Sequence, residues 1–178
     1  MSINENYWCI AIVNNRHEKK VAVAVTDLGY DVYVPIQRET HEWSRGRKRV
    51  VDVVIIPAKI FIRIDDSDRV KLLQAGIGVK YFMTDACQSE DTIRKSIAHI
   101  PDSQIQAFKM MLAGSSRRID FSEFRFIKGE RVKVESGPMM GLEGIVKYDA
   151  NGKAKIHILL DALGNVSTEI SPDILVKL

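Results

Sequence analysis

The sequence is poor in cysteine and lacks long apolar runs, so it does not resemble a disulfide-rich or a membrane-spanning protein. It contains two cysteines among 178 residues, Cys9 and Cys87, so neither a disulfide framework nor a cysteine metal site is expected. No apolar run approaches the roughly 20 residues that a membrane-spanning helix needs. The short polar start, residues 1–6, does not resemble a signal peptide. We therefore expect reduced thiols and a cytoplasmic location.

An excess of charge of one sign is also missing. The chain holds 26 basic and 23 acidic residues, and its net charge is +3. That excess is too small to indicate nucleic-acid binding, so any electrostatic contact with nucleic acid must be local. The length fits one domain or two small ones.

Signs of catalysis are weak. The sequence has no nucleophile elbow, no phosphate-binding glycine loop and no metal-ligand spacing, and its four histidines lie in unrelated contexts. Residues 65–68 resemble the start of a calcium loop, but the glycine and the distal glutamate do not follow, so we interpret them as a helix cap. We expect no enzyme, no cofactor and no metal.

Apolar periodicity in the first half alternates between strands and helices. We expect strands at 8–13, 32–34, 50–56, 60–64 and 79–82, helices at 18–28, from 66 and from 101, and a polar loop over 37–49. This β-α-β-β-α-β pattern predicts helices on one face of a mostly antiparallel sheet.

The second half contains short strands and tight turns. Strands are expected at 131–135, 144–148, 155–160, 166–170 and 174–176, after a linker beginning at Gly114, and together they predict a small barrel. The segment from Gly137 to Val146 holds three glycines and a proline before it re-enters a strand. We expect these glycines where φ is positive or where another backbone passes closely.

That segment resembles the KOW motif, and both halves together are similar to the NusG family of transcription elongation factors. The resemblance is carried by Trp8, residues 16–21, Tyr33-Val34-Pro35, Trp43-Ser44, Arg47-Lys48, Ile56-Pro57, Ile60-Phe61, Gly129-Glu130, Gly141–Gly144 and residues 169–173. It implies an α+β fold, with an NGN domain of RRM- or ferredoxin-like antiparallel sheet and helices, followed by a small all-β SH3-like KOW barrel. The expected bounds are 5–112 for the NGN domain, 113–124 for a linker and 125–178 for the KOW domain.

The resemblance also implies a function. We expect a monomeric elongation and antitermination factor that binds the β′ clamp helices of RNA polymerase and suppresses pausing or termination. It would touch DNA of the transcription bubble and recruit a ribosomal protein or a termination factor through its KOW domain. A ribosome- or RNA-binding KOW protein is the alternative, and an enzyme on an RRM-like scaffold is a third. Where family members usually carry Phe-Pro-Gly-Tyr, this chain has Ile56-Pro57-Ala58-Lys59, which resembles a specialised paralogue of the RfaH or UpxY type.

Three groups of residues are candidates for binding. The resemblance implies polymerase contact at Trp8, Tyr33, Ile56, Pro57, Lys59 and Phe61, although strand residues of this kind also build sheet cores. Nucleic-acid contact is expected at Arg16, His17, Lys19, Lys20, Arg38, Trp43, Arg45, Arg47, Lys48 and Arg49, because guanidinium groups pair with phosphates and an indole stacks on a base. A solvated hairpin tip and a polar helix face are the alternatives.

The third candidate group is the KOW motif itself. A partner is expected at Gly137, Pro138, Met139, Met140, Gly141, Leu142 and Gly144, since methionine suits an adaptable contact surface. The alternative is a loop folded over the mouth of the barrel.

Overall fold

The computed structural model describes residues 7–43, 46–84, 96–115, 119–122, 129–160 and 163–178. The chain divides into two units, one of residues 1–34 and 56–102, the other of residues 35–55 and 103–178. We call them the N-terminal unit and the C-terminal unit and describe each by itself.

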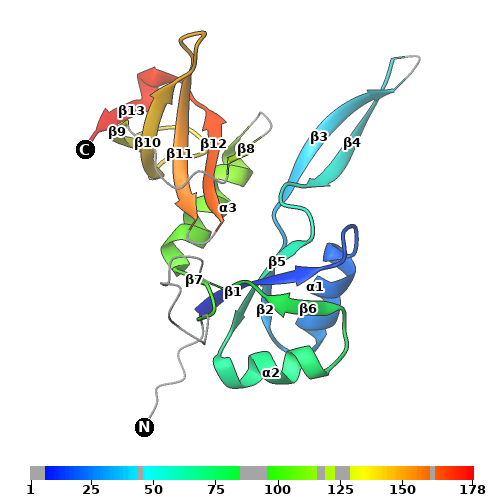
Figure 1. The fold of residues 1–178 in the computed structure, drawn as a ribbon. Coiled ribbons are helices and arrows are strands. Elements are labelled where there is room, and N and C mark those ends of the chain that lie inside the picture. The colour runs from blue at the N-terminus through cyan, green and yellow to red at the C-terminus, as the bar shows by residue number, and fades with distance from the viewer. Residues whose placement is uncertain (1–6, 44–45, 85–95, 116–118, 123–128, 161–162) are drawn as a thin grey trace. The chain divides into compact units, whose positions relative to one another are not determined.

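The N-terminal unit is an antiparallel sheet with two helices (Figure 1). Its strands run in the order β2 (Asp31–Tyr33), β5 (Lys59–Ile64), β1 (Tyr7–Val13) and β6 (Val79–Phe82), and β7 (His99–Ile100) also pairs with β1. The helices are α1 (Glu18–Asp27) and α2 (Asp66–Gln74). This arrangement confirms the mixed α/β fold expected from the sequence.

The core of this unit lies between the sheet and the two helices. Alternate residues of β1 and β5 supply its sheet side, and α1 and α2 supply the other; its members include Cys9, Ala11, Ile62, Val25 and Leu72. The period of two in the strands and the helical spacing of Val21 and Val25 explain why these side chains meet.

A buried carboxylate fixes the turn before β5. Glu18, the first residue of α1, is 3% exposed, and its Oε1 accepts a hydrogen bond of 2.7 Å from the backbone N–H of Ala58. Ala58 has a φ of 60°, which a non-glycine residue adopts at a cost. The hydrogen bond from Ala58 to Glu18 therefore helps to hold the turn that Pro57 and Ala58 form.

The C-terminal unit contains a hairpin, a helix and a second antiparallel sheet. The hairpin is β3 (Ile36–Trp43) with β4 (Arg47–Val54), and the helix is α3 (Asp102–Gly114), which is in this unit from Ser103 onward. The sheet runs in the order β13 (Leu175–Lys177), β9 (Glu130–Val134), β10 (Glu143–Tyr148), β11 (Ala154–Leu160), β12 (Gly164–Glu169) and β8 (Asp120–Ser122). A short 3-10 helix, η1 (Pro172–Ile174), precedes β13.

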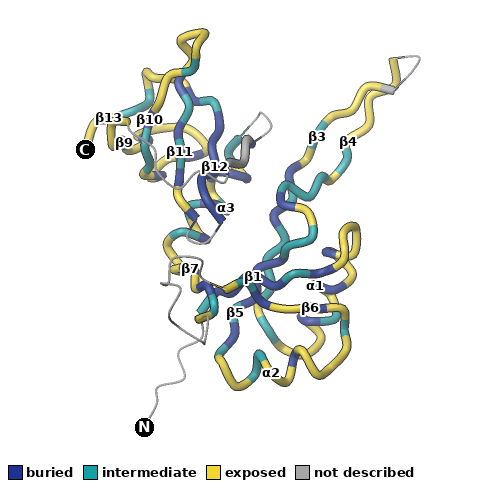
Figure 2. Tube along the Cα trace, viewed as in Figure 1, coloured by how far each residue is buried: buried dark blue, intermediate teal, exposed yellow. Residues whose placement is uncertain are grey.

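The C-terminal sheet closes over an apolar interior, as Figure 2 shows by the alternating burial along its strands. Its inward residues include Val132, Val146, Ile156, Ile158 and Val166, all buried. Gly137 and Gly141 have φ of 86° and 88°, as expected for the turns that lead into β10. The small all-β domain predicted from the second half is confirmed.

Two expectations need correction. The expectation of a polar loop over 37–49 is wrong. Most of this segment forms strands β3 and β4, which pair in continuous register from Ile36↔Val54 to Trp43↔Arg47. Polar residues of a two-sided exposed ribbon lack the apolar alternation that marks a half-buried strand. The segment expected as a linker contributes β8, which pairs with β12. Cys87 lies outside the described residues.

None of the helices in the described ranges is long and apolar enough to cross a membrane.

The N-cap of α2 gives a pH-dependent prediction. The Asp65 carboxylate accepts a hydrogen bond of 2.7 Å from the Asp68 N–H, and this contact holds the pKa of Asp65 below its ordinary 3.8. A lowered folded-state pKa stabilises the fold above the unfolded value, and this stabilisation is lost as pH falls through the folded value. In urea unfolding, wild type should therefore exceed Asp65→Asn in stability at neutral pH and lose that advantage in acid. A difference between the two proteins that stays constant with pH would contradict this cap.

Candidate functional site

Half of the residues expected to contact polymerase are buried. Trp8, Ile56 and Phe61 are buried, Tyr33 and Lys59 are half-buried, and Pro57 is exposed. Tyr33 and Phe61 pack together with ring centroids 5.9 Å apart. Trp8, Ile56 and Phe61 are therefore core residues. The accessible surface of the group comes from Tyr33, Pro57 and Lys59.

Strands β1 and β5 are apolar on both faces. Cys9 and Ile62 face the helices, and the alternate residues Trp8, Ile10 and Phe61 face the opposite side, where they are buried too. The Nε1 of Trp8 donates a 2.6 Å hydrogen bond to Oδ1 of Asp102, the first residue of α3, and Arg63 pairs with the same carboxylate at 3.3 Å. A polar edge thus borders the second apolar face.

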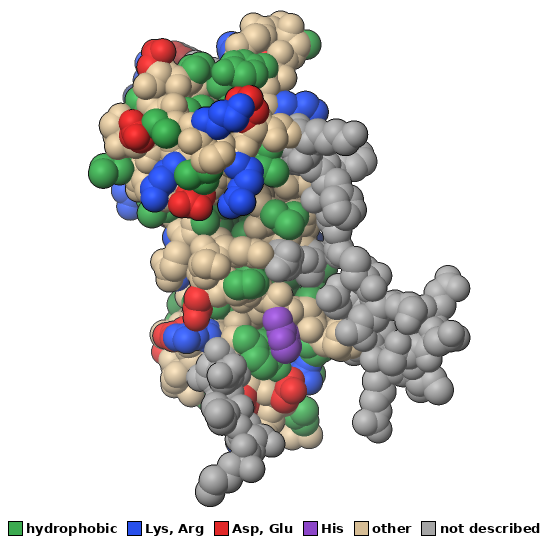
Figure 3. All heavy atoms as spheres, turned by 90° about the vertical axis from the view of Figure 1, so that its left-hand side faces the viewer, with side chains coloured by type: hydrophobic (Ala, Val, Ile, Leu, Met, Phe, Trp, Pro, Cys, Tyr) green, Lys and Arg blue, Asp and Glu red, His purple; other side chains and the backbone are tan. Residues whose placement is uncertain are grey.

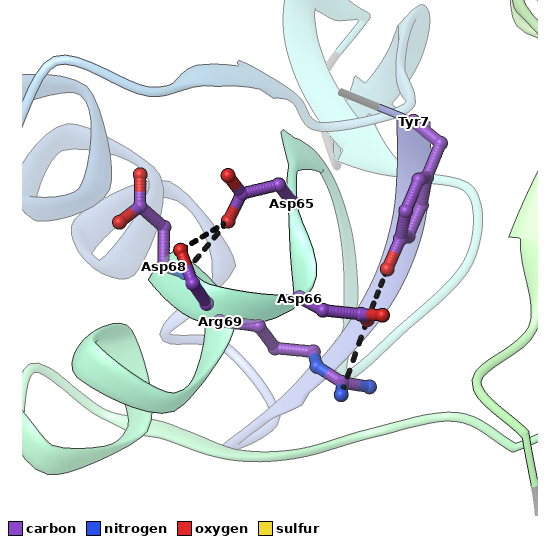
Figure 4. A network of polar contacts seen from close by, with 6 residues as sticks. Tyr7, Asp65, Asp66, Asp68 and Arg69 are labelled. Carbon is purple, nitrogen blue, oxygen red and sulfur yellow. Dashed lines mark hydrogen bonds and ion pairs between the residues drawn. The ribbon is translucent and has the colours of Figure 1, made fainter. Parts of the chain in front are cut away.

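The start of β1, next to α2, carries a cluster of polar contacts (Figure 4). The Tyr7 hydroxyl donates to Asp66, which also pairs with Arg69 at 3.3 Å, and the Tyr7 ring stacks on His99 with centroids 3.6 Å apart. Burial, reinforced by the bond to Asp66, raises the pKa of Tyr7. This cluster joins β1, α2 and β7.

The one cysteine in the described ranges is held as a thiol. Cys9 is buried, and burial raises its pKa to about 12, so a thiolate is disfavoured at neutral pH. Among the described residues no three His, Cys, Asp or Glu side chains form a group that could hold a metal ion.

The pairing register of the hairpin places its charged residues differently on its two faces. Arg47 and Arg49 pair with Trp43 and His41, whereas Lys48 and Arg38 pair with the acidic residues Glu42 and Asp52. Directly paired residues share a face of a ribbon, and the face alternates along each strand. One face therefore carries Arg47 and Arg49 with two aromatic positions and, farther from the tip, Glu39, whose Oε2 lies 3.1 Å from Nε2 of His41. The other face carries basic residues opposite acidic ones.

The basic residues of the hairpin are accessible. Arg38, Arg47, Lys48 and Arg49 are all exposed, and the outer half of the hairpin in Figure 2 is exposed as well. Arg38 forms a loose pair with Asp52, with 3.7 Å between Nε and Oδ1. The Trp43 side chain and all of Arg45 lie outside the described residues.

The basic residues at the start of α1 belong to the other unit. Arg16, His17, Lys19 and Lys20 are exposed, and Arg16 has a φ of 67°. His17 precedes the helix, and its Nδ1 lies 3.2 Å from the Asn15 carbonyl oxygen. The sequence placed these cations correctly on the surface, but it gave no sign that Glu18 between them is buried.

Of the two methionines and the leucine in the KOW-like segment, one keeps its side chain on the surface. Met140 is 66% exposed, whereas Met139 and Leu142 are buried. Gly137, Pro138 and Gly141 are exposed and Gly144 is half-buried. The upper part of Figure 3, which is the C-terminal unit, shows hydrophobic, acidic and basic side chains interspersed over its surface. Of Met139, Met140 and Leu142, only Met140 is therefore accessible to a partner.

Comparison with known proteins agrees with this fold. The family model described as "NusG: Transcription termination factor nusG" matches residues 6–109. The chain belongs to the NusG family. No curated protein sequence matches this NusG-family chain significantly.

Among solved structures, the chain is similar to NusG of Thermotoga maritima, from a structure titled "Domain interaction in Thermotoga maritima NusG". The two share 16% identity over 98% of each chain, with a TM-score of 0.52. A chain of the MjSpt4:Spt5 complex shares 12% identity over 96% of each chain, with a TM-score of 0.30. The first likeness supports the fold of the whole chain.

Burial of Phe61 predicts a large loss of stability on truncation. Phe61 is fully buried, so Phe61→Ala should lower the free energy of unfolding by about 3–5 kcal/mol, from lost apolar burial and the cavity left behind. The measurement is urea denaturation of the full chain. Val23→Ala, at a position of α1 that is 62% exposed, is the control and should change stability by less than about 0.5 kcal/mol. Equal effects of the two substitutions would show that Phe61 is not a core residue.

Proposed function

We propose that this chain is a transcription elongation factor that binds RNA polymerase and opposes pausing or termination. The observation that carries the proposal is the family match over residues 6–109, which covers the whole N-terminal sheet and most of α3. Members of the NusG family bind RNA polymerase, and the family match covers the N-terminal domain of this chain.

The surface proposed for polymerase is the turn and strand edge around Pro57. Pro57 is exposed, and Tyr33 and Lys59 keep part of their surface accessible. Buried Trp8, Ile56 and Phe61 would support this surface from within the sheet. Lysine at position 59, where relatives commonly carry an aromatic residue, would give the contact a charged component.

The mechanism proposed for the effect on pausing is differential binding. A factor that binds the active conformation of polymerase more tightly than the paused one shifts the population toward the active state. Shifting a 1:99 equilibrium to 99:1 requires about 5.5 kcal/mol of differential affinity, so a smaller preference reduces pausing without abolishing it.

The hairpin is proposed to contact DNA of the transcription bubble. On its face with His41 and Trp43, Arg47 and Arg49 have no acidic residue directly opposite, and Glu39 lies farther from the tip beside His41. The two guanidinium groups are therefore the cations offered to phosphate. The exposed cations at the start of α1 would add a second contact. The C-terminal sheet would recruit a further partner, with Met140 as the accessible apolar residue.

A pull-down with the full chain as bait separates this proposal from a ribosomal role. RNA polymerase in the eluate, with pausing reduced when the protein is added to purified polymerase on a template with a pause and a terminator, is the expected result. Ribosomal RNA without polymerase, or a protein with no effect on either pausing or termination, would overturn the proposal.

Charge reversal tests the hairpin face by face. The double variant Arg47→Glu/Arg49→Glu should bind a fluorescent DNA with an unpaired bubble at least about tenfold more weakly than wild type. The slope of log K against log salt concentration should become shallower by about 2. The matched control, Arg38→Glu with Lys48→Glu, changes the same total charge on the face where each residue is opposite an acid, and it should have a clearly smaller effect. Equal losses for the two pairs would indicate net charge rather than a defined face.

A further inference from the structure

A cavity of about 630 Å³ lies within the C-terminal unit, between α3 and the outer face of strands β9 to β12. Ala107 and Met110 of α3 form one wall, and Ile145 and Leu159 contribute apolar surface from β10 and β11. Its volume is in the range of sites that enclose a ligand. Met110 and Leu159 keep 37% and 42% of their surface exposed, so the apolar lining is reachable from solvent.

A buried amide lines the same cavity. Asn165 of β12 is 4% exposed, and its Nδ2 is buried without a hydrogen-bond partner among the described residues. Asn165 is paired with Leu159 across β11 and β12, and it alternates with the inward Val166, so it belongs to the outer face that the cavity covers. An unpaired buried amide is costly, and a carboxamide offers both a donor and an acceptor.

The Arg131 guanidinium lies on the side of the cavity opposite Asn165. Arg131 of β9 is exposed and forms no ion pair with the described residues, whereas the nearby Glu143 is paired with Lys133 at 3.5 Å. Both Arg131 and Glu143 line the cavity, and Glu143 already has Lys133 as a cationic partner, so Arg131 is the lining charge without a partner among the described residues. The cavity therefore favours a ligand that carries an anionic group.

We propose that this cavity binds a short extended peptide of a partner protein, with apolar side chains and an acidic group. The peptide's apolar side chains would lie against Met110, Ile145 and Leu159, a backbone amide would pair with the Asn165 carboxamide, and its carboxylate would meet Arg131.

The dimensions of the sheet fit this occupant. β9 and β12 are three strand spacings apart in the sheet, which is about 14 Å. Arg131 is in register with Ile145, His157 and Ser167, so Asn165 lies two residues, or about 7 Å, farther along its strand, and the separation is about 16 Å. Five extended residues span about 17 Å, so a single short segment reaches from Arg131 to Asn165. A peptide group also supplies both the acceptor and the donor that a carboxamide can use.

The test is selection of a random heptapeptide library, displayed on phage, against the full chain without polymerase. Failure of this selection is therefore distinct from failure of the proposed transcription role. Clones rich in apolar and acidic residues should be enriched, and synthetic copies should bind with one peptide per chain. Ala107→Trp, which fills the cavity, and Arg131→Glu, which reverses its charge, should each weaken binding at least about tenfold.

Two further variants make the result specific. Asn165→Leu removes the unpaired amide at similar size and should weaken binding several-fold, while circular dichroism and thermal unfolding verify that each variant is folded. Lys147→Glu, an equal charge reversal on an exposed position of β10 outside the cavity, should leave binding unchanged.

Three outcomes would overturn the proposal. The first is no enrichment of apolar and acidic clones, and the second is enriched peptides that bind the Ala107→Trp variant as well as they bind wild type. The third is a chain that dimerises at the assay concentration and becomes monomeric with Ala107→Trp, which would make a second copy the occupant.

Discussion

The N-terminal unit depends on the two central strands β1 and β5, which are apolar on both faces and must be covered on both. Helices α1 and α2 cover one face, where Cys9, Ala11 and Ile62 are buried. The other face buries Trp8, Ile10 and Phe61 and ends at the Trp8–Asp102–Arg63 contacts. The proposed polymerase surface follows from this constraint, because the large side chains remain inside and the Pro57 turn, fixed by the Glu18 carboxylate, is presented outside.

In the hairpin, the pairing register of β3 and β4 determines which charges share a face. A chain with almost balanced charge can still present a basic surface if its strands place like charges on one face. In β3 and β4 the pairing puts Arg47 and Arg49 together, and it places Glu42 and Asp52 opposite the remaining cations. A one-residue slip of this register would mix the two faces, so any affinity of the hairpin for nucleic acid depends on its turn.

Much of the fold followed from the sequence, and the departures have physical reasons. Strong periodicity located β1, α1, β5, α2 and the strands of the second half, and the glycines at 137 and 141 have the positive φ that was expected. Residues 37–49 of the hairpin were taken for a loop because they are almost all polar on both faces, whereas a strand was expected from Val50 onward. Strands β7 and β8 were missed because two or three residues carry no period, and the burial of Met139 and Leu142 depends on contacts distant in sequence. The cavity beside α3 has no sequence signal, since its lining comes from five separate elements.

Hydrogen–deuterium exchange of the full chain, alone and with purified RNA polymerase, tests the central claim most directly. The account predicts slow exchange in β1 and β5 in both samples, and added protection on binding around Pro57 and along the β3–β4 hairpin. Unchanged exchange throughout residues 6–109 at saturating polymerase would contradict it.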